Sequence, residues 1–459
     1  MSKNQEDTKR QLALYMNKKS TLYQSIAGLY DSWFQVLYNL AFLLFRQMLP
    51  LLSWIARKGI KNQKTYFFFN GQKGLIASIE KEWAGKKENT IWIHCSSYGE
   101  FGIARPLIKA IKETTSYKIV LTFFSPSGYE AIKDNHPLID YLYYLPLDTP
   151  SNARRFVHAL RPQKAIFMVS ELWMNYLKVL EKEQTPTYLV SALITPKSVV
   201  SKWYGHAYRS QLRSFTRILT LNDSTRQILL QSGYDRAVVT SDPLFDNVHL
   251  IAQTPYRNQV IEGFATENPL FIAGSIDCQE DLKLTAALAN NHPETKFVVV
   301  PHELYPEALQ TIRKAFRGKV CFHSECKNTP SEQFKDCQIL IIDYMGELSY
   351  LYRYGTWAYV GGGFTPYLHN VLEATVYGLP VAFGPCIERK AVAQELISLQ
   401  IGGQVRTPEE LNRWFQLQNT APEKLEQVKT TALKYMNEHR NITQGILHLL
   451  DFQTQKESL

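Results

Sequence analysis

From about residue 90 onward, short runs of hydrophobic residues alternate with longer segments in which hydrophobic and polar positions are mixed. Continuous hydrophobic runs separated by helix-length segments are typical of parallel strands that helices cover on both faces. The pattern therefore predicts an α/β protein with two series of strands. The predicted strands are Ile91–Cys95, Lys118–Phe124, Lys164–Val169, Thr187–Ser191 and Arg217–Leu221, and then Leu270–Ala273, Phe297–Val300, Ile339–Ile342, Trp357–Val360 and Pro380–Phe383.

Two series of strands predict two doubly wound, Rossmann-like domains, which the length of 459 residues easily accommodates. The boundary is expected near Asn247–Asn268, where the strand signals lapse. In such sheets ligands bind at the carboxyl ends of the strands, so the site is expected in a cleft between the domains. The predicted division is residues 1–60 as a polar tail and a membrane-associated helix, 61–250 as the N-terminal α/β domain, 251–425 as the C-terminal α/β domain and 426–459 as C-terminal helices.

The segment Trp33–Ala56 is strongly hydrophobic and follows a polar, basic start. It is long enough to cross a hydrocarbon core of about 30 Å. However, it contains Arg46 and Pro50, and an arginine at mid-bilayer costs at least about 2.5 kcal/mol. An in-plane or shallowly inserted membrane helix is therefore favoured, while a single span and a buried soluble helix remain open. Three lysines follow that would face anionic headgroups, namely Lys58, Lys61 and Lys64.

The charge balance adds a preference for anionic partners. There are 51 Lys and Arg residues against 42 Asp and Glu residues, a formal net charge of +9. No motif of a nucleic-acid-binding domain accompanies this charge, so nucleic acid is not an expected partner. The six cysteines form no CxxC pair, and neither HExxH nor Asp-x-Asp occurs, so no metal site is predicted.

The strongest acidic candidate follows the first strand. Glu100 is expected in the first turn of a helix, behind a small-residue turn that contains Ser97 and Gly99. One interpretation is a carboxylate that only complements the helix dipole. The other is a general base. Glu171 stands in the same position after the strand that ends at Val169, and a local capping role would explain it equally well.

The strongest glycine signal lies in the second half of the chain. Gly361, Gly362 and Gly363 follow a strand, and Asn370 and Glu373 then open a predicted helix. Glycines let the backbone approach a ligand, and a helix N-terminus supplies N–H groups for a phosphate. A capping box would explain the Asn-x-x-Glu spacing without any ligand. Similar turns follow two other strands, at Gly346 and Glu347 and at Pro301 and His302.

Together these motifs resemble the 3-deoxy-D-manno-octulosonic acid (Kdo) transferases of lipopolysaccharide synthesis. The resemblance runs from about Tyr30 to the C-terminal helices. It rests on these motifs: Gly71-Gln-Lys-Gly74, His94-Cys-Ser-Ser-Tyr-Gly-Glu100, Ser125-Pro-Ser-Gly128, Tyr144-Leu-Pro-Leu-Asp148, Glu171-Leu-Trp-Met-Asn175, Phe245-Asp246, Ala273-Gly-Ser275, Met345-Gly-Glu-Leu348 and the glycine run with His369-Asn370 and Glu373.

The resemblance implies a GT-B fold and the inverting transfer of Kdo from CMP-Kdo to a lipid A precursor at the cytoplasmic face of the inner membrane. It implies that Glu100 is the general base, and that no cofactor is needed besides the donor. The implied acceptor-side residues are Ser97, Gly99 and Glu171. The implied nucleotide-sugar ligands are Pro301, His302, Gly346, Glu347, Gly361, Gly362, Gly363, Asn370 and Glu373.

One departure concerns the donor phosphate. The family often has an arginine where this chain has His302, and Arg389 or Lys390 is the expected substitute. Three other functions stay open: a GT-B transferase that uses a UDP-sugar and another lipid acceptor, a nucleotide-sugar 2-epimerase, which would need neither the hydrophobic segment nor a lipid, and a non-catalytic lipid-binding scaffold.

Overall fold

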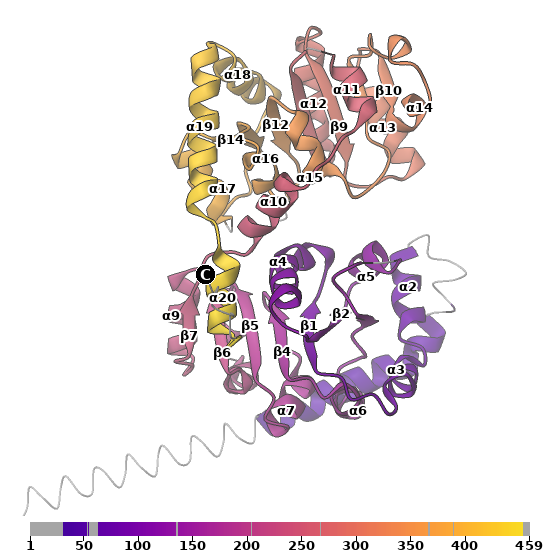
Figure 1. Ribbon diagram of the computed structural model, residues 1–459, viewed down its shortest axis with the longest axis vertical. Helices are drawn as coiled ribbons and strands as arrows, with labels where there is room; N and C mark the ends of the chain where they lie inside the picture. Colours follow the sequence, from indigo (N-terminus) through magenta and orange to yellow (C-terminus); the bar gives the residue numbers. More distant parts are fainter. Residues whose placement is uncertain are drawn as a thin grey trace, which may run out of the picture. The chain divides into compact units, whose positions relative to one another are not determined.

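The computed structural model describes residues 31–52, 54, 63–134, 136–202, 204–266, 268–365, 368–388 and 390–452. The chain folds into two compact units (Figure 1). The N-terminal unit comprises Met1–Leu244 with Asn441–Leu459, and the C-terminal unit comprises Phe245–Arg440. Each unit is built on its own sheet, which agrees with the two predicted series of strands.

The N-terminal unit contains a seven-stranded sheet in the order β3-β2-β1-β4-β5-β6-β7, in which every neighbouring pair is parallel. The order reverses between β1 and β4, because the chain builds β2 and β3 on one side of β1 and the remaining strands on the other. The strands are β1 (Thr90–Cys95), β2 (Lys118–Phe123), β3 (Tyr141–Tyr144), β4 (Lys164–Met168), β5 (Thr187–Ala192), β6 (Arg217–Thr220) and β7 (Ala237–Val239).

Helices cover both faces of this sheet, as the continuous hydrophobic runs require. On one face Trp92 of β1 is fully buried, and its ring meets those of Phe156, Phe167 and Tyr176 at 5.0 to 5.4 Å between centroids. On the other face Ile91 and the neighbouring strands pack with α4. The helices are α2 (Gln63–Gly71), α3 (Leu75–Trp83), α4 (Tyr98–Thr114), α5 (Pro126–Ile132), α6 (Pro150–Leu160), α7 (Met174–Lys182), α8 (His206–Gln211), α9 (Asp223–Gln231) and α20 (Ile442–Leu449).

The C-terminal unit repeats this architecture with a parallel sheet in the order β10-β11-β9-β8-β12-β13-β14. Here the order reverses between β8 and β12. The strands are β8 (Leu270–Ile276), β9 (Lys296–Pro301), β10 (Val320–Phe322), β11 (Ile339–Ile341), β12 (Trp357–Val360), β13 (Val381–Phe383) and β14 (Gly402–Gln404).

One face of this second sheet packs against α12, α13 and α18, with Phe271 and Phe415 in the shared core. The helices of the unit are α10 (Leu244–Gln253), α11 (Gln259–Ala265), α12 (Gln279–Asn291), α13 (Pro306–Ala315), α14 (His323–Cys326), α15 (Leu348–Leu351), α16 (Leu372–Thr375), α17 (Ala391–Ser398), α18 (Pro408–Gln418) and α19 (Pro422–Glu438). The predicted α/β class with two doubly wound units is confirmed.

The C-terminal helices do not form the separate segment 426–459 that the sequence predicts. Helix α19 belongs to the C-terminal unit, where Tyr435 packs on Phe245 and His249 bonds the carbonyl of Met436 at 2.8 Å. Helix α20 belongs to the N-terminal unit and packs on α4. Its hydrophobic residues Ile446 and Leu447 join the core there. Burial of these side chains, not the position of α20 in the sequence, decides which unit holds it.

The helix Asp31–Leu52 is long and hydrophobic enough to cross a membrane, and it is the one such helix among the described residues. One side of it contacts the N-terminal unit through polar groups. The Tyr38 hydroxyl donates to the Asp148 carboxylate at 2.7 Å, and the Gln35 amide donates to the Asn175 side chain at 3.1 Å. The other side exposes a stripe of large hydrophobic residues, here called the apolar stripe: Trp33, Val36, Leu37, Leu40, Leu43, Leu44, Met48 and Leu51.

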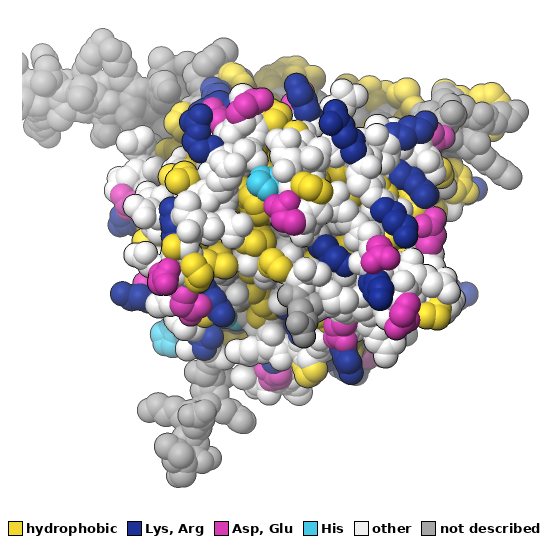
Figure 2. Space-filling model, turned by 90° about the horizontal axis from the view of Figure 1, so that it is seen from above, with side chains coloured by type: hydrophobic (Ala, Val, Ile, Leu, Met, Phe, Trp, Pro, Cys, Tyr) yellow, Lys and Arg dark blue, Asp and Glu magenta, His cyan; other side chains and the backbone are white. Residues whose placement is uncertain are grey.

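The basic excess of the chain is not gathered on the face that Figure 2 shows. Lys and Arg side chains are interspersed there with Asp and Glu side chains. Such a mixed surface is ordinary for a soluble domain and gives this face no extended positive field.

Candidate functional site

The first cluster of candidate residues lies at the carboxyl ends of β1 and β4, where the strand order of the N-terminal unit reverses. Ligands of doubly wound sheets bind at such reversal points. Glu100 lies in the first turn of α4, directly after β1, as predicted. Glu171 follows β4, so neighbouring parallel strands bring the two carboxylates to one edge of the sheet.

Glu100 is a carboxyl group whose charged form is disfavoured. Burial, and then the nearby charge of Glu171, raise the pKa of Glu100 to about 8, although the backbone N–H of Ser96 donates to the Glu100 carboxylate and opposes the shift. A carboxyl group with a pKa near the working pH can accept a proton and retain it through a reaction step. Such a shift suits a general base better than a group that only complements a helix dipole.

Glu171 is held in its charged form by polar neighbours. Burial alone would raise the pKa of Glu171, but interactions with His94, Ser96 and Trp173 outweigh it and lower the pKa. The His94 Nε2 lies 3.5 Å from the Glu171 carboxylate and also accepts from the Trp173 indole at 3.0 Å. Because Glu171 stays ionised, it keeps a negative charge beside Glu100.

The turn before α4 is open where the sequence predicts an acceptor. Ser97 is the residue before the first turn of α4, and its side chain makes no capping hydrogen bond to the helix. A methyl group on Gly99 would meet only the Ser97 hydroxyl, at 3.8 Å. Packing therefore does not require glycine at this position, which leaves the approach of a ligand as a reason for it.

Packing and backbone conformation within the C-terminal unit explain the glycine run. A side chain on Gly361 would come within 2.0 Å of the carbonyl oxygen of Ser275, and one on Gly363 within 2.5 Å of the backbone of Gly384. Gly362 has a φ of +82°, which favours glycine. The close approach of these backbone segments explains the run without a ligand, so by itself the run is weaker evidence for a phosphate site than the sequence suggests.

Asp281, which the sequence analysis did not select, organises this edge of the second sheet. Its side chain is fully buried on α12 and accepts from the Tyr359 hydroxyl at 2.7 Å and from the backbone N–H of Gly362 at 2.9 Å. The backbone N–H of Asp277 donates to the same carboxylate at 3.2 Å. Hydrogen bonds to the Asp281 carboxylate thus connect the loops that follow β8 and β12.

Asn370 and Glu373 meet each other but do not form a capping box. The Asn370 amide donates to the Glu373 carboxylate at 3.2 Å, and its oxygen accepts from the backbone N–H of Leu372 at 3.1 Å. The expected helix is only the four-residue α16, which begins at Leu372. Burial raises the pKa of Glu373 to about 7, opposed by the bond from Asn370.

Glu347 is already engaged by its own unit. The hydroxyls of Tyr256 and Tyr344 both donate to one of its oxygens, the latter at 2.7 Å. Gly346 next to it has a φ of +99°, a conformation that favours glycine. These contacts account for both residues structurally, and their predicted part in donor binding stays a prediction.

A cluster that the sequence analysis missed surrounds His302, which follows Pro301 at the end of β9. Asp277 after β8 and His369 after β12 offer ligand atoms that lie, with one from His302, within 4.8 Å of one another. The centroids of the imidazole rings of His302 and His369 are 4.6 Å apart. Asp277 and His302 directly follow β8 and β9, and His369 lies in the segment after the glycine turn of β12. The adjacency of these strands in the sheet is the signal that could have revealed the cluster.

Of the two expected substitutes for the missing arginine, Lys390 and Arg389, only Lys390 lies among the described residues. Lys390 precedes α17 and is close enough to His369 for its charge to lower the pKa of that imidazole. Arg389 lies outside the described residues. Its predicted contact with a phosphate stays a prediction.

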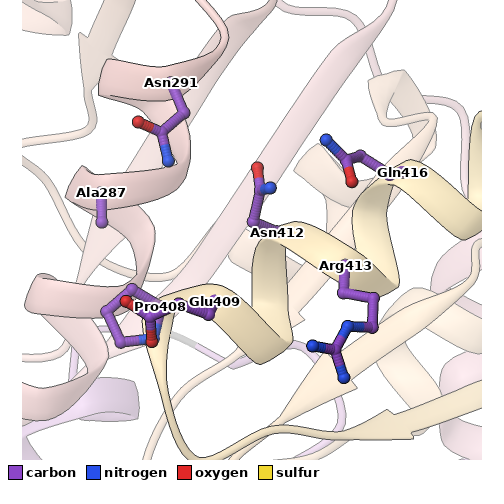
Figure 3. Close-up of a pocket in the computed structure, with 7 residues that line it drawn as sticks. All are labelled: Ala287, Asn291, Pro408, Glu409, Asn412, Arg413 and Gln416. Atoms are coloured by element: carbon purple, nitrogen blue, oxygen red, sulfur yellow. The ribbon is translucent and has the colours of Figure 1, made fainter.

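A surface groove lies away from all these residues, between α12 and α18 (Figure 3). It contains no residue of the predicted site and no strand end. The lining residues are Ala287, Asn291, Pro408, Glu409, Asn412, Arg413 and Gln416.

Known proteins resemble this chain in sequence and in fold. Residues 71–247 match the family model of the 3-deoxy-D-manno-octulosonic-acid transferases (kdotransferases). The chain is 26% identical over 373 residues to the 3-deoxy-D-manno-octulosonic acid transferase of Haemophilus influenzae, with 78% of this chain and 86% of the relative covered. It is 25% identical over 328 residues to the enzyme of the same name from Aquifex aeolicus, with 70% and 84% covered.

The fold also resembles the crystal structure of a UDP-N-acetylglucosamine 2-epimerase. The TM-score is 0.56 at 12% identity, and 81% of this chain and 98% of the epimerase are covered. At this identity the likeness concerns the fold alone. It confirms the expected GT-B type of two doubly wound units.

Proposed function

We propose, because the chain belongs to the Kdo transferase family, that it is an inverting glycosyltransferase that moves Kdo from CMP-Kdo to a lipid A precursor. The relatives that carry this name cover both halves of the chain, which favours this function over that of a UDP-sugar transferase, an epimerase or a lipid-binding scaffold. The observation on which the mechanism rests is the half-buried Glu100, whose pKa is raised to about 8 at the reversal point of the first sheet.

In the proposed reaction, Glu100 accepts the proton of the acceptor's primary hydroxyl. The acceptor oxygen forms a bond to the anomeric carbon of Kdo on the face opposite the nucleotide, and the bond from that carbon to the phosphate oxygen breaks. CMP leaves with the electron pair of that bond, so the configuration inverts. Ser97 and Gly99 are the proposed acceptor-side neighbours, and the C-terminal unit is proposed to hold the nucleotide.

The decisive test is turnover with defined substrates. We expect the purified chain to transfer Kdo from CMP-Kdo to a tetra-acylated lipid A precursor, as measured by mass spectrometry of the lipid. Added CMP should inhibit this transfer, whereas equal UDP should not. Inhibition by UDP alone, together with transfer from a UDP-sugar, would favour the rival transferase. Epimerisation of a nucleotide sugar without any lipid would favour the epimerase.

The charge of Glu171 predicts a pH effect. If Glu100 is the base, kcat/KM should rise with pH through the pKa of Glu100, about 8 in the free protein. Glu171→Gln removes a negative charge that raises this pKa, so the rising limb should move to lower pH. The measurement is the pH dependence of kcat/KM for CMP-Kdo. The matched control is Glu113→Gln, at an exposed position of α4, the helix that contains Glu100. This variant should leave the rising limb of the pH profile in place. An unmoved limb in Glu171→Gln would contradict the proposed base.

We also propose that the helix Asp31–Leu52 lies in the plane of the inner membrane's cytoplasmic surface. The Tyr38 hydroxyl and the Gln35 amide nitrogen bond side chains of the N-terminal unit, while the apolar stripe faces away from those contacts. A helix with one docked side and one exposed hydrophobic side suits the interface between headgroups and acyl chains. The lysines expected to meet anionic headgroups fall where no side chain is described.

Substitutions in the apolar stripe test this placement. The double variant Leu40→Gln with Leu44→Gln should weaken binding to vesicles of anionic phospholipid at least ~10-fold, because each leucine loses apolar burial in the lipid. Leu417→Gln on α18 is the matched control, since Leu417 is 48% exposed and Leu40 is 47% exposed. Vesicle co-sedimentation measures the effect. Equal binding by both variants would contradict the in-plane helix.

A further inference from the structure

Asp277, His302 and His369 form a cluster in the C-terminal unit, and of these three only His302 was predicted to take part in donor binding. Three different segments supply its members, and each segment follows one of the adjacent strands β8, β9 and β12. The reversal of strand order between β8 and β12 places the cluster where doubly wound sheets bind ligands. A chance gathering of surface groups would not need this location.

The backbone fixes two of the three positions. The backbone N–H of His302 donates to the carbonyl of Ile276 at 2.9 Å, which ties the residue after β9 to the last residue of β8. The backbone N–H of His369 donates to the carbonyl of Gly361 at 3.2 Å, which folds the segment after β12 back over its glycine turn. The two imidazole rings are thereby held side by side.

Among the described residues, no side-chain hydrogen bond to the rest of the unit engages the cluster. His369 Nε2 is shielded from solvent and has no hydrogen-bond partner among the described residues. The nearest acidic atom is an Asp277 carboxylate oxygen, 4.0 Å away. Because buried polar atoms normally have a bonding partner, an imidazole nitrogen that is shielded from water and unpartnered indicates a position where a ligand binds.

We propose that Asp277, His302 and His369 form a binding site for a divalent transition-metal ion of the zinc class. Two imidazole nitrogens and one carboxylate oxygen are a ligand set that zinc accepts, and three protein ligands leave a coordination position open. Ligand atoms around tetrahedral zinc lie about 3.3 Å apart, given bonds of about 2.0 Å. The present atoms lie within 4.8 Å, so small rotations of the partly exposed side chains close the site.

The open position suits an oxygen of a nucleotide phosphate, and this step rests on the proposed function. A metal ion bound there would supply positive charge for the phosphate of CMP, at the reversal point where the nucleotide is expected. By thermodynamic reciprocity, zinc and CMP should then strengthen each other's binding.

The test is calorimetric titration of the tag-free full chain, stripped with a chelator, with zinc chloride and without any substrate. We expect one zinc ion per chain in the wild type, and binding weakened at least ~100-fold in His302→Ala and in His369→Ala. His158→Ala, at an exposed histidine of α6, is the matched control and should retain the wild-type affinity. Magnesium should not compete, because it prefers oxygen ligands alone.

Two further measurements keep the result interpretable. Asp277→Asn alters a partly exposed side chain, so it should fold normally and still weaken zinc binding. Cobalt should give the visible absorption of a low-symmetry site in the wild type and not in His302→Ala. CMP should bind about 10-fold more tightly with zinc than without, whereas cytidine should show no difference.

The outcomes separate this proposal from the proposed function. Equal zinc binding by the wild type and all three cluster variants, or none by the wild type, would overturn the metal site even if Kdo transfer is observed. Zinc binding that depends on the cluster, in a chain that transfers no Kdo, would uphold the site and reject the transferase. Zinc binding without any effect on CMP would overturn only the phosphate step.

Discussion

Glu100→Gln is expected to lower kcat for Kdo transfer by roughly 10²- to 10⁴-fold, the range that general-base catalysis contributes. Glutamine has nearly the same shape as glutamate but does not accept the proton of the acceptor hydroxyl. The affinity for CMP should not change, because the nucleotide is proposed to bind to the C-terminal unit. Steady-state kinetics and calorimetry with CMP measure the two quantities.

The thermal stability of the same variant separates a base from a structural carboxylate. Burial raises the pKa of Glu100 to about 8, above its value in an unfolded chain, so its protonated form is favoured by folding. The stability that this group contributes is full below the unfolded pKa and is lost as the pH rises through about 8. Glu100→Gln should therefore keep or raise Tm at pH 9. A lowered Tm with unchanged turnover would show that Glu100 only supports the start of α4.

Asp281→Ala is expected to destabilise the C-terminal unit by at least ~3 kcal/mol, which for a unit of this size lowers Tm by roughly 6–12 °C. The substitution removes a fully buried carboxylate and leaves the Tyr359 hydroxyl and the backbone N–H of Gly362 without their partner. Hydrogen exchange should rise in the peptides that contain the glycine run and Asp277. Calorimetry together with exchange mass spectrometry measures both effects.

The neighbouring Glu280 supplies the control for Asp281. It precedes Asp281 in the first turn of α12 but is exposed. Glu280→Ala should change the stability by less than about 1 kcal/mol, as an exposed residue near a helix start does. If Asp281→Ala were as stable as Glu280→Ala, Asp281 would not be the residue that holds the loops after β8 and β12 together.

The strands that the sequence did not reveal are the edges of both sheets. The ten predicted strands correspond to the interior strands β1, β2, β4, β5, β6, β8, β9, β11, β12 and β13. The four that were missed, β3, β7, β10 and β14, are three or four residues long and lie at the edges. An edge strand is flanked on one side only, so it needs no continuous hydrophobic run, and β14 even begins with two glycines.

The candidate site was predictable where a single residue follows a strong strand. Glu100 and Glu171 were found because each lies within a few residues of the end of a hydrophobic run, and the structure places both at the carboxyl-end edge of the sheet. The cluster around His302 was missed because its members are separated by 25 and 67 residues in the chain, and only the order of the strands brings them together. The glycine run also allows close packing of backbone segments, and its predicted part in donor binding stays a prediction.

The position of α20 has a consequence for folding during synthesis of the protein. The N-terminal unit is translated first, and domains usually fold as they emerge from the ribosome. Here, however, the helix that packs on α4 follows the whole C-terminal unit in the sequence. The first unit therefore leaves the ribosome with a hydrophobic surface uncovered, and it waits for the whole second unit to be synthesised before its own fold is complete.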